Sequence, residues 1–147
     1  MIKYQKIFGM VVSDAIGRLL KAIDYPSGEV SLDGRGCFVL KVDDAEMRVR
    51  EENGRLTLVC PLERPDEVRL AQLAGYAAGR LLKEDAALAW DPERDELILW
   101  QSVSAMADAA LMRRVFEVFA LSCDWWRDRA GGVTSARAAS PEMMIRP

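Results

Sequence analysis

The sequence predicts an α+β fold in the order helix, three strands, helix, two strands, helix, with an antiparallel sheet packed on the helices. Three observations predict it. Apolar residues recur at helical spacing over residues 2–23 and again after residue 104. The pair Asn53-Gly54, between two short β-prone runs, is typical of a tight hairpin, and Pro65 before two acidic residues is typical of a helix start.

The first expected element is a helix over residues 2–23. On a helix its apolar side chains sweep an arc of roughly 220°, about twice the stripe that one core-facing helix needs. We therefore expect part of this helix to face something other than its own core. Those side chains are Tyr4, Ile7, Phe8, Val11, Val12, Ala15, Ile16, Leu19, Leu20 and Ile23.

The middle of the chain predicts a three-stranded antiparallel meander over residues 37–42, 46–51 and 55–61, whose first strand is apolar on both faces. A second helix should follow from Pro65 to about residue 82. Small residues recur along it and would let another backbone approach closely: Ala71, Ala74, Gly75, Ala78 and Gly79.

Residues 86–90 and 96–101 predict a second hairpin around the turn that begins with Asp91. If Asp91 lies opposite Asp95, then Leu88 faces Ile98, Ala86 faces Trp100, and both faces of the hairpin are apolar.

A third helix, capped by Ser102 or Ser104, should reach about residue 129, with one member of the pair Trp125-Trp126 in the core. We expect one domain over residues 1–130 and a flexible tail over 131–147, because the tail lacks periodicity.

The composition argues against catalysis. The chain has no histidine, which removes the commonest general base and metal ligand. Its acidic clusters fall in turns, where solvated side chains are the usual reason for them. We therefore expect no catalytic residues, no metal and no cofactor, and a small metal-dependent enzyme is the less favoured hypothesis.

Charge and cysteine usage limit the partners. A net charge of -3 opposes the neutralisation of phosphates, so we expect no nucleic acid. The three cysteines form no CxxC pair and are interpreted as buried thiols in a reducing compartment. No stretch predicts a signal peptide or membrane insertion, so a cytoplasmic protein is expected. The surplus of apolar surface favours protein interfaces, with an ordinary core as the alternative.

The order of elements, together with the stretch over residues 32–40 and the end of the last helix, Trp125-Trp126-Arg127-Asp128, resembles the class I type III secretion chaperones. These small acidic proteins bind effector proteins before export. The resemblance implies a homodimer around which an effector's N-terminal segment wraps in extended form, kept soluble and secretion-competent without ATP. An adaptor or regulatory protein of the same fold that binds a folded partner is the alternative.

The resemblance also implies two sets of site residues. The effector-binding groove would contain Val12, Ile16, Leu19, Leu20, Ile23, Phe38 and Leu40. The dimer interface would contain Leu73, Gly75, Leu88, Ile98 and Trp100. Acidic residues at the rim would favour a basic partner. On this hypothesis Ile16→Asp or Leu20→Asp abolishes effector binding and leaves a folded dimer.

Overall fold

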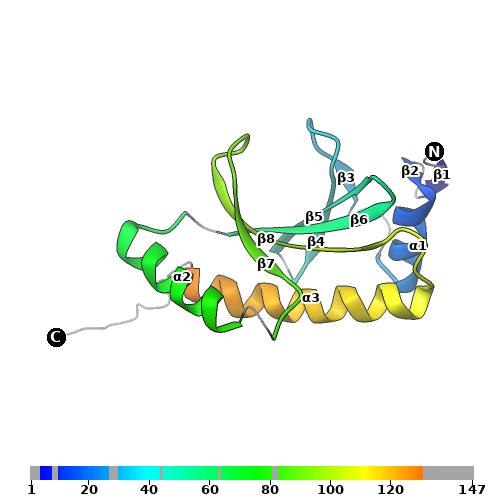
Figure 1. Cartoon of the computed structure of the whole chain (residues 1–147). Helices are drawn as coiled ribbons and strands as arrows, with labels where there is room; N and C mark the ends of the chain where they lie inside the picture. Colours follow the sequence, from blue (N-terminus) through cyan, green and yellow to red (C-terminus); the bar gives the residue numbers. More distant parts are fainter. Residues whose placement is uncertain are drawn as a thin grey trace. The chain divides into compact units, whose positions relative to one another are not determined.

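A computed structural model of the chain describes residues 4–7, 10–26, 30–43, 45–62, 64–80 and 83–130 (Figure 1). Within them lie three helices and a six-stranded antiparallel sheet, which confirms the predicted fold class. The elements in chain order are β1 (Tyr4–Ile7), β2 (Met10–Ser13), α1 (Asp14–Ala22), β3 (Ser31–Leu32), β4 (Phe38–Val42), β5 (Ala45–Glu52), β6 (Arg55–Leu62), α2 (Glu67–Arg80), β7 (Ala87–Asp91), β8 (Glu96–Ser104) and α3 (Ala109–Ala130).

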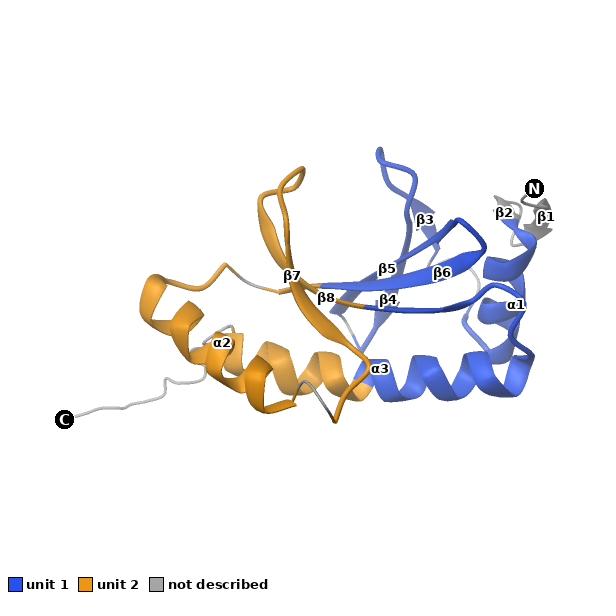
Figure 2. Cartoon of the chain, in the orientation of Figure 1, with its two compact units in different colours: residues 1–60, 101–120 blue, residues 61–100, 121–147 orange. Residues whose placement is uncertain are grey.

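The chain divides into two compact units (Figure 2). Unit 1 comprises residues 1–60 and 101–120, and unit 2 comprises residues 61–100 and 121–147. Strand β8 and helix α3 each contribute residues to both units. The expected single domain over residues 1–130 therefore contains two units, and the expected tail lies outside the described residues.

Strands β4, β5 and β6 form the predicted meander. The full sheet runs in the order β3-β4-β5-β6-β8-β7, so β3 and β7 are the outermost described strands. Glu52 pairs with Arg55 across Asn53-Gly54, whose φ angles of 54° and 77° match a type I′ turn. The sequence signal for this turn is confirmed.

One face of the meander supplies the core of unit 1. Helix α1 contacts β5, and the first half of α3 adds further apolar side chains. Alternation along each strand sends every second side chain to this face. The buried set includes Ala15, Ile16, Leu19, Leu20, Phe38, Leu40, Met47, Val49, Leu56, Leu58, Met112, Phe116 and Phe119.

The first helix is shorter than the sequence predicts. It begins at Asp14, after the side chain of Ser13 accepts a hydrogen bond from the Ile16 N–H at 3.1 Å, and the preceding described residues form the hairpin β1–β2. A serine cap starts a helix, and the aromatic and β-branched residues before it favour strands. The prediction of a helix over residues 2–23 is therefore wrong, and the 220° arc counted side chains that do not belong to the helix.

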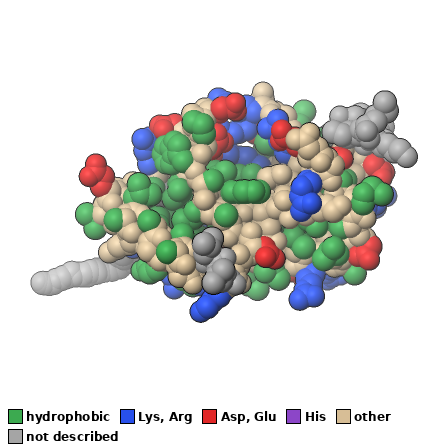
Figure 3. All heavy atoms as spheres, viewed as in Figure 1, with side chains coloured by type: hydrophobic (Ala, Val, Ile, Leu, Met, Phe, Trp, Pro, Cys, Tyr) green, Lys and Arg blue, Asp and Glu red, His purple; other side chains and the backbone are tan. Residues whose placement is uncertain are grey.

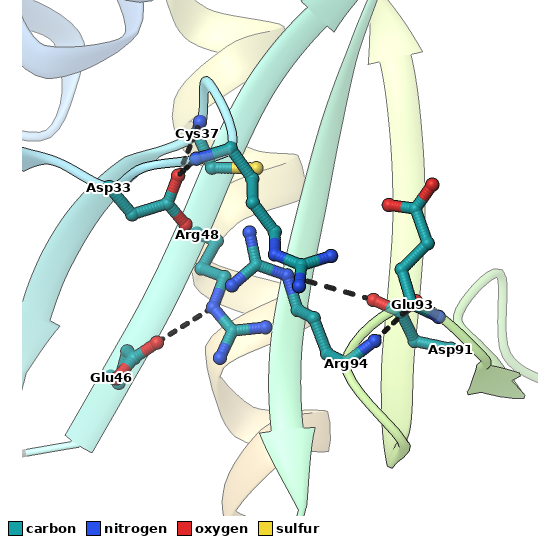
Figure 4. A network of polar contacts seen from close by, with 8 residues as sticks. Asp33, Cys37, Glu46, Arg48, Asp91, Glu93 and Arg94 are labelled. Carbon is teal, nitrogen blue, oxygen red and sulfur yellow. Dashed lines mark hydrogen bonds and ion pairs between the residues drawn. The ribbon is translucent and has the colours of Figure 1, made fainter.

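The β7–β8 hairpin differs from the prediction by one residue. Asp91 pairs with Glu96, not Asp95, because the loop has four residues. The Asp91 Oδ1 accepts from the backbone N–H of Glu93 at 3.0 Å (Figure 4). A one-residue slip exchanges the two faces of a strand. Leu88 therefore lies opposite Leu99, and Ala87 lies opposite Trp100.

Aspartates cap the two longer helices. The Asp66 Oδ1 accepts from the N–H of Arg69 at 2.7 Å at the start of α2, and the Asp108 Oδ1 accepts from the N–H of Leu111 at 2.8 Å at the start of α3. The expected cap of α3 by Ser102 or Ser104 is wrong, because β8 continues through both serines. Trp126 is buried and Trp125 is half-buried, as the prediction of one core tryptophan requires.

Candidate protein-binding surfaces

The expected effector-binding residues lie mostly in the core of unit 1. Ile16, Leu19 and Leu20 of α1 are at most 2% exposed, and Leu40 of β4 is fully buried. Phe38 is 8% exposed. Ile23 is half-buried, and the side chain of Val12 lies outside the described residues. The buried members cannot touch a second chain while unit 1 stays closed.

The opposite face of the same meander is charged. The outward side chains of β5 are two glutamates that flank two arginines, and Arg48 Nε lies 2.7 Å from Glu46 Oε2 (Figure 4). Arg50 Nε lies 3.5 Å from Glu52 Oε1. The registers place Lys41 and Arg55 on this face too. Among the described side chains named on this face, the basic ones outnumber the acidic ones, and the acidic rim expected from the sequence stays a prediction.

Strand β3 presents an edge of the sheet with an exposed apolar side chain. Leu32 is 57% exposed. The loop that follows is held by Asp33, whose Oδ1 accepts from the N–H of Arg35 at 2.8 Å and from the N–H of Cys37 at 3.0 Å (Figure 4). Gly36 in this loop has a φ of 86°, which a side chain rarely permits. The edge is therefore supported by a structured turn. No pattern in the sequence indicated Leu32 as a contact.

In unit 2, helix α2 exposes most of its surface. All of its residues are described, and Leu73 is the one that is buried. Hydrophobic side chains gather on the surface over α2 and the β7–β8 hairpin (Figure 3). Val68 is 71% exposed. The outward face also carries the small residues Ala71, Ala74, Gly75, Ala78 and Gly79, all exposed.

The α2 glycines are not needed by the fold of the subunit. A Cβ added at Gly75 or Gly79 would meet no heavy atom within 4 Å, and neither residue has a positive φ. A glycine inside a helix costs about 0.5–1 kcal/mol relative to alanine. These positions lower helix stability without an internal packing reason.

The expected dimer-interface residues divide by exposure. Gly75 is exposed, Trp100 is 38% exposed, and Ile98 is half-buried on the same face of β8 as Trp100. Leu73 is fully buried, and Leu88 lies on the opposite face of the hairpin. Val68 and Trp90 (43% exposed) are further candidate contacts that the sequence did not indicate, because periodicity alone does not tell an exposed apolar side chain from a buried one.

The described residues contain no group of three or more His, Cys, Asp or Glu side chains that could hold a metal ion. Cys37, Cys60 and Cys123 are buried, as predicted. Within the described part of the chain, no helix has the length and apolar character needed to cross a bilayer.

The model of the Tir chaperone protein (CesT) family matches residues 15–127, a range that includes residues of both units. The chain belongs to the CesT family. The resemblance to class I type III secretion chaperones is thereby confirmed, and the chain is a member of a chaperone family. No curated protein sequence matches this CesT-family chain at a significant level.

Solved structures share the fold. A chain in the HopA1–SchA chaperone–effector complex is 17% identical with a TM-score of 0.59, covering 75% of this chain and 88% of its own. One in the ExsC–ExsE complex is 18% identical with a TM-score of 0.59, covering 78% and 92%. One in the ExoT–SpcS complex from Pseudomonas aeruginosa is 20% identical with a TM-score of 0.55, covering 76% and 92%. At these identities the likeness establishes the fold of this CesT-family chain.

Proposed function

We propose that this CesT-family chaperone acts as a cytoplasmic homodimer that binds the N-terminal segment of a secreted effector and keeps it soluble and secretion-competent. The family match carries the proposal. Chains of the same fold occur in the HopA1–SchA chaperone–effector complex and in the ExoT–SpcS complex. The exposed apolar and small residues of this chain supply surfaces for both kinds of contact.

The outward face of α2 is the proposed centre of the dimer. The axes of two packed helices usually lie about 8–10 Å apart, and small side chains at the contact allow a shorter distance. A second copy packed there would give the glycines at positions 75 and 79 the packing partner that the subunit lacks. Trp100 and Ile98 of β8 would extend the contact with apolar area. Leu73, which was expected at the interface, is buried and would hold α2 against the rest of its own subunit.

Unit 1 is the proposed effector-binding part. An extended segment can add to the edge of a sheet through backbone hydrogen bonds, with alternate side chains entering apolar contacts. Strand β3 offers such an edge, with Leu32 exposed beside it. Ile23 would contact the segment directly. The buried Ile16, Leu19, Leu20, Phe38 and Leu40 would form the floor that holds this surface in place.

Co-expression with the N-terminal segments of candidate secreted proteins tests the proposal. Light scattering should give the mass of two subunits plus one segment, and limited proteolysis should protect an N-terminal stretch of the client. A clean monomer at micromolar concentration would contradict the homodimer. Binding to a folded domain but to no isolated segment would favour the adaptor alternative.

Two variants separate the surfaces. Leu32→Asp should weaken segment binding at least about tenfold, with Met106→Asp as the matched control because Met106 is also exposed, at 86%. Gly75→Leu should convert the dimer to a folded monomer, whereas Gly34→Leu should not, although a Cβ at either glycine meets no heavy atom within 4 Å.

A further inference from the structure

The ring of Trp125 in unit 2 is held between two guanidinium groups. The Cζ of Arg129 lies 3.6 Å from the ring centroid, and the Cζ of Arg80 lies 3.8 Å from it. Two planar groups this close cannot share one face of the ring, so the indole is sandwiched. Tyr76 and Trp126 approach its edge, with centroids at 5.7 Å and 5.0 Å and interplanar angles of 79° and 76°. Cations on the faces and aromatic rings at the edge match the charge distribution of an indole.

Each guanidinium is fixed by a further contact. The Arg129 Nη1 donates to the Trp125 carbonyl at 3.0 Å, one turn earlier on α3. The Arg80 Nε donates to Glu84 Oε2 at 2.7 Å. The other oxygen of the same carboxylate, Oε1, accepts from the Trp126 Nε1 at 3.3 Å, and Trp126 is 2% exposed. Glu84 therefore links Arg80 of α2 to Trp126 of α3, while Arg80 also contacts the ring of Trp125.

These contacts all use one side of α2. Leu73, Tyr76 and Arg80 are spaced by three and four residues, so they share one stripe along the helix. The exposed small residues, Ala71, Gly75 and Ala78 among them, fall on the opposite side. Leu73 is the only residue of α2, described throughout, that is fully buried. With a single fully buried side chain on α2, the contacts of Tyr76 and Arg80 with Trp125 contribute to the orientation of the helix about its axis.

We propose that Trp125 is a positioning residue that sets the rotation of α2 about its axis, so that the small-residue face points toward a second copy of the chain. The proposal rests on the homodimer of the proposed function. Both subunits of a homodimer must hold the competent orientation, so the apparent dissociation constant rises by the inverse square of the fraction of subunits that hold it. Loss of the sandwich should therefore weaken dimerisation even though Trp125 lies on the side away from the partner.

Substitutions of Trp125 in the full chain test the proposal. Trp125→Leu removes both cation–π contacts and should raise the dimer dissociation constant at least about fivefold, whereas Trp125→Phe retains an aromatic face and should stay within about threefold of the wild type. Sedimentation equilibrium gives the constants. Far-ultraviolet circular dichroism of each variant should match the wild type, because helix α2 still forms.

If Trp125→Leu does not fold, a second pair of variants tests the positioning role of Trp125. Arg129→Met should raise the dissociation constant, and Arg129→Lys should restore it, because an ammonium group also binds an aromatic face. A folded Trp125→Leu or Arg129→Met variant with unchanged helicity and an unchanged constant would overturn the positioning role alone. A monomeric wild-type chain would overturn the homodimer and the positioning role together.

Discussion

Leu88 lies directly opposite Leu99 in the β7–β8 pair, so it belongs to the face of the buried Leu97 and Leu99 and not to the face of Ile98 and Trp100. Along β8, Leu97 and Leu99 thus form a core side, and Ile98 and Trp100 form an open side. The register of this strand separates residues that stabilise the subunit from residues that can contact another chain.

Leu99→Ala should lower the free energy of unfolding by about 2–5 kcal/mol, because Leu99 is fully buried and its loss leaves a cavity. Urea denaturation measures the change. Trp100→Ala serves as the comparison on the open face: it should affect subunit stability less and weaken dimerisation more. Equal losses of stability from the two variants would contradict the observed register.

Gly54→Ala should destabilise unit 1 by about 1–2 kcal/mol, because Gly54 has a φ of 77° in the type I′ turn and a side chain is strained there. Thermal unfolding followed by circular dichroism checks this. Gly34→Ala is the matched control, since its φ is not positive and the added Cβ meets nothing within 4 Å. Similar effects at both glycines would argue against the turn type.

Asp108→Ala should cost about 0.5–2 kcal/mol, because it removes the cap that accepts the Leu111 N–H at 2.8 Å at the start of α3. Asp124→Ala, inside the same helix, provides the control. Asp124 lies 3.7 Å from Arg127, and its side chain is 66% exposed, so its loss should change little. Chemical denaturation of both variants gives the comparison.

Gly75→Ala should change two measurements in opposite directions. The subunit, diluted to a monomer, should gain about 0.5–1 kcal/mol of stability from the better helix former. Dimerisation should become weaker, because the methyl group occupies space on the face proposed for the second copy. Unfolding at low concentration and sedimentation at high concentration test both signs, and a gain in both would place the contact elsewhere.

Ile16→Asp should unfold unit 1, because Ile16 is 2% exposed and a buried carboxylate without compensation costs several kcal/mol, roughly the stability of a small domain. Loss of the cooperative unfolding transition would show this. The sequence hypothesis expects a folded dimer that no longer binds effector. Recovery of such a dimer would restore Ile16 to the contact surface.

The meander could be predicted because its signals are local. Asn53-Gly54 requires positive φ angles, and Met47 and Val49 alternate with charged residues along β5. Such signals depend on neighbouring residues only, so the rest of the fold does not override them.

The start of the chain and the second hairpin were mispredicted for a different reason. Apolar residues before Ser13 fit helical spacing by coincidence. Ser13 falls at a position where a helix of this spacing would carry a polar residue, so its role as the N-cap could not be recognised. The loop after Asp91 could hold three or four residues, and one residue decides which face Leu88 takes.

The residues proposed to contact a partner chain were harder to predict than the fold. Periodicity identified Ile16, Leu19 and Leu20 as apolar helix residues, but it cannot tell an apolar side chain in the core from one that awaits a partner. Leu32, by contrast, lies in a strand of two residues that has no period to detect.

The division of β8 and α3 between the units has a consequence for synthesis. Unit 1 needs residues 101–120, so its core cannot close when its first 60 residues have left the ribosome. Domains that are continuous in sequence can fold one after another as they emerge. Here unit 1 must wait until residues 61–100 have been made, so β3 and its neighbours become a completed surface only after residues 101–120 have emerged.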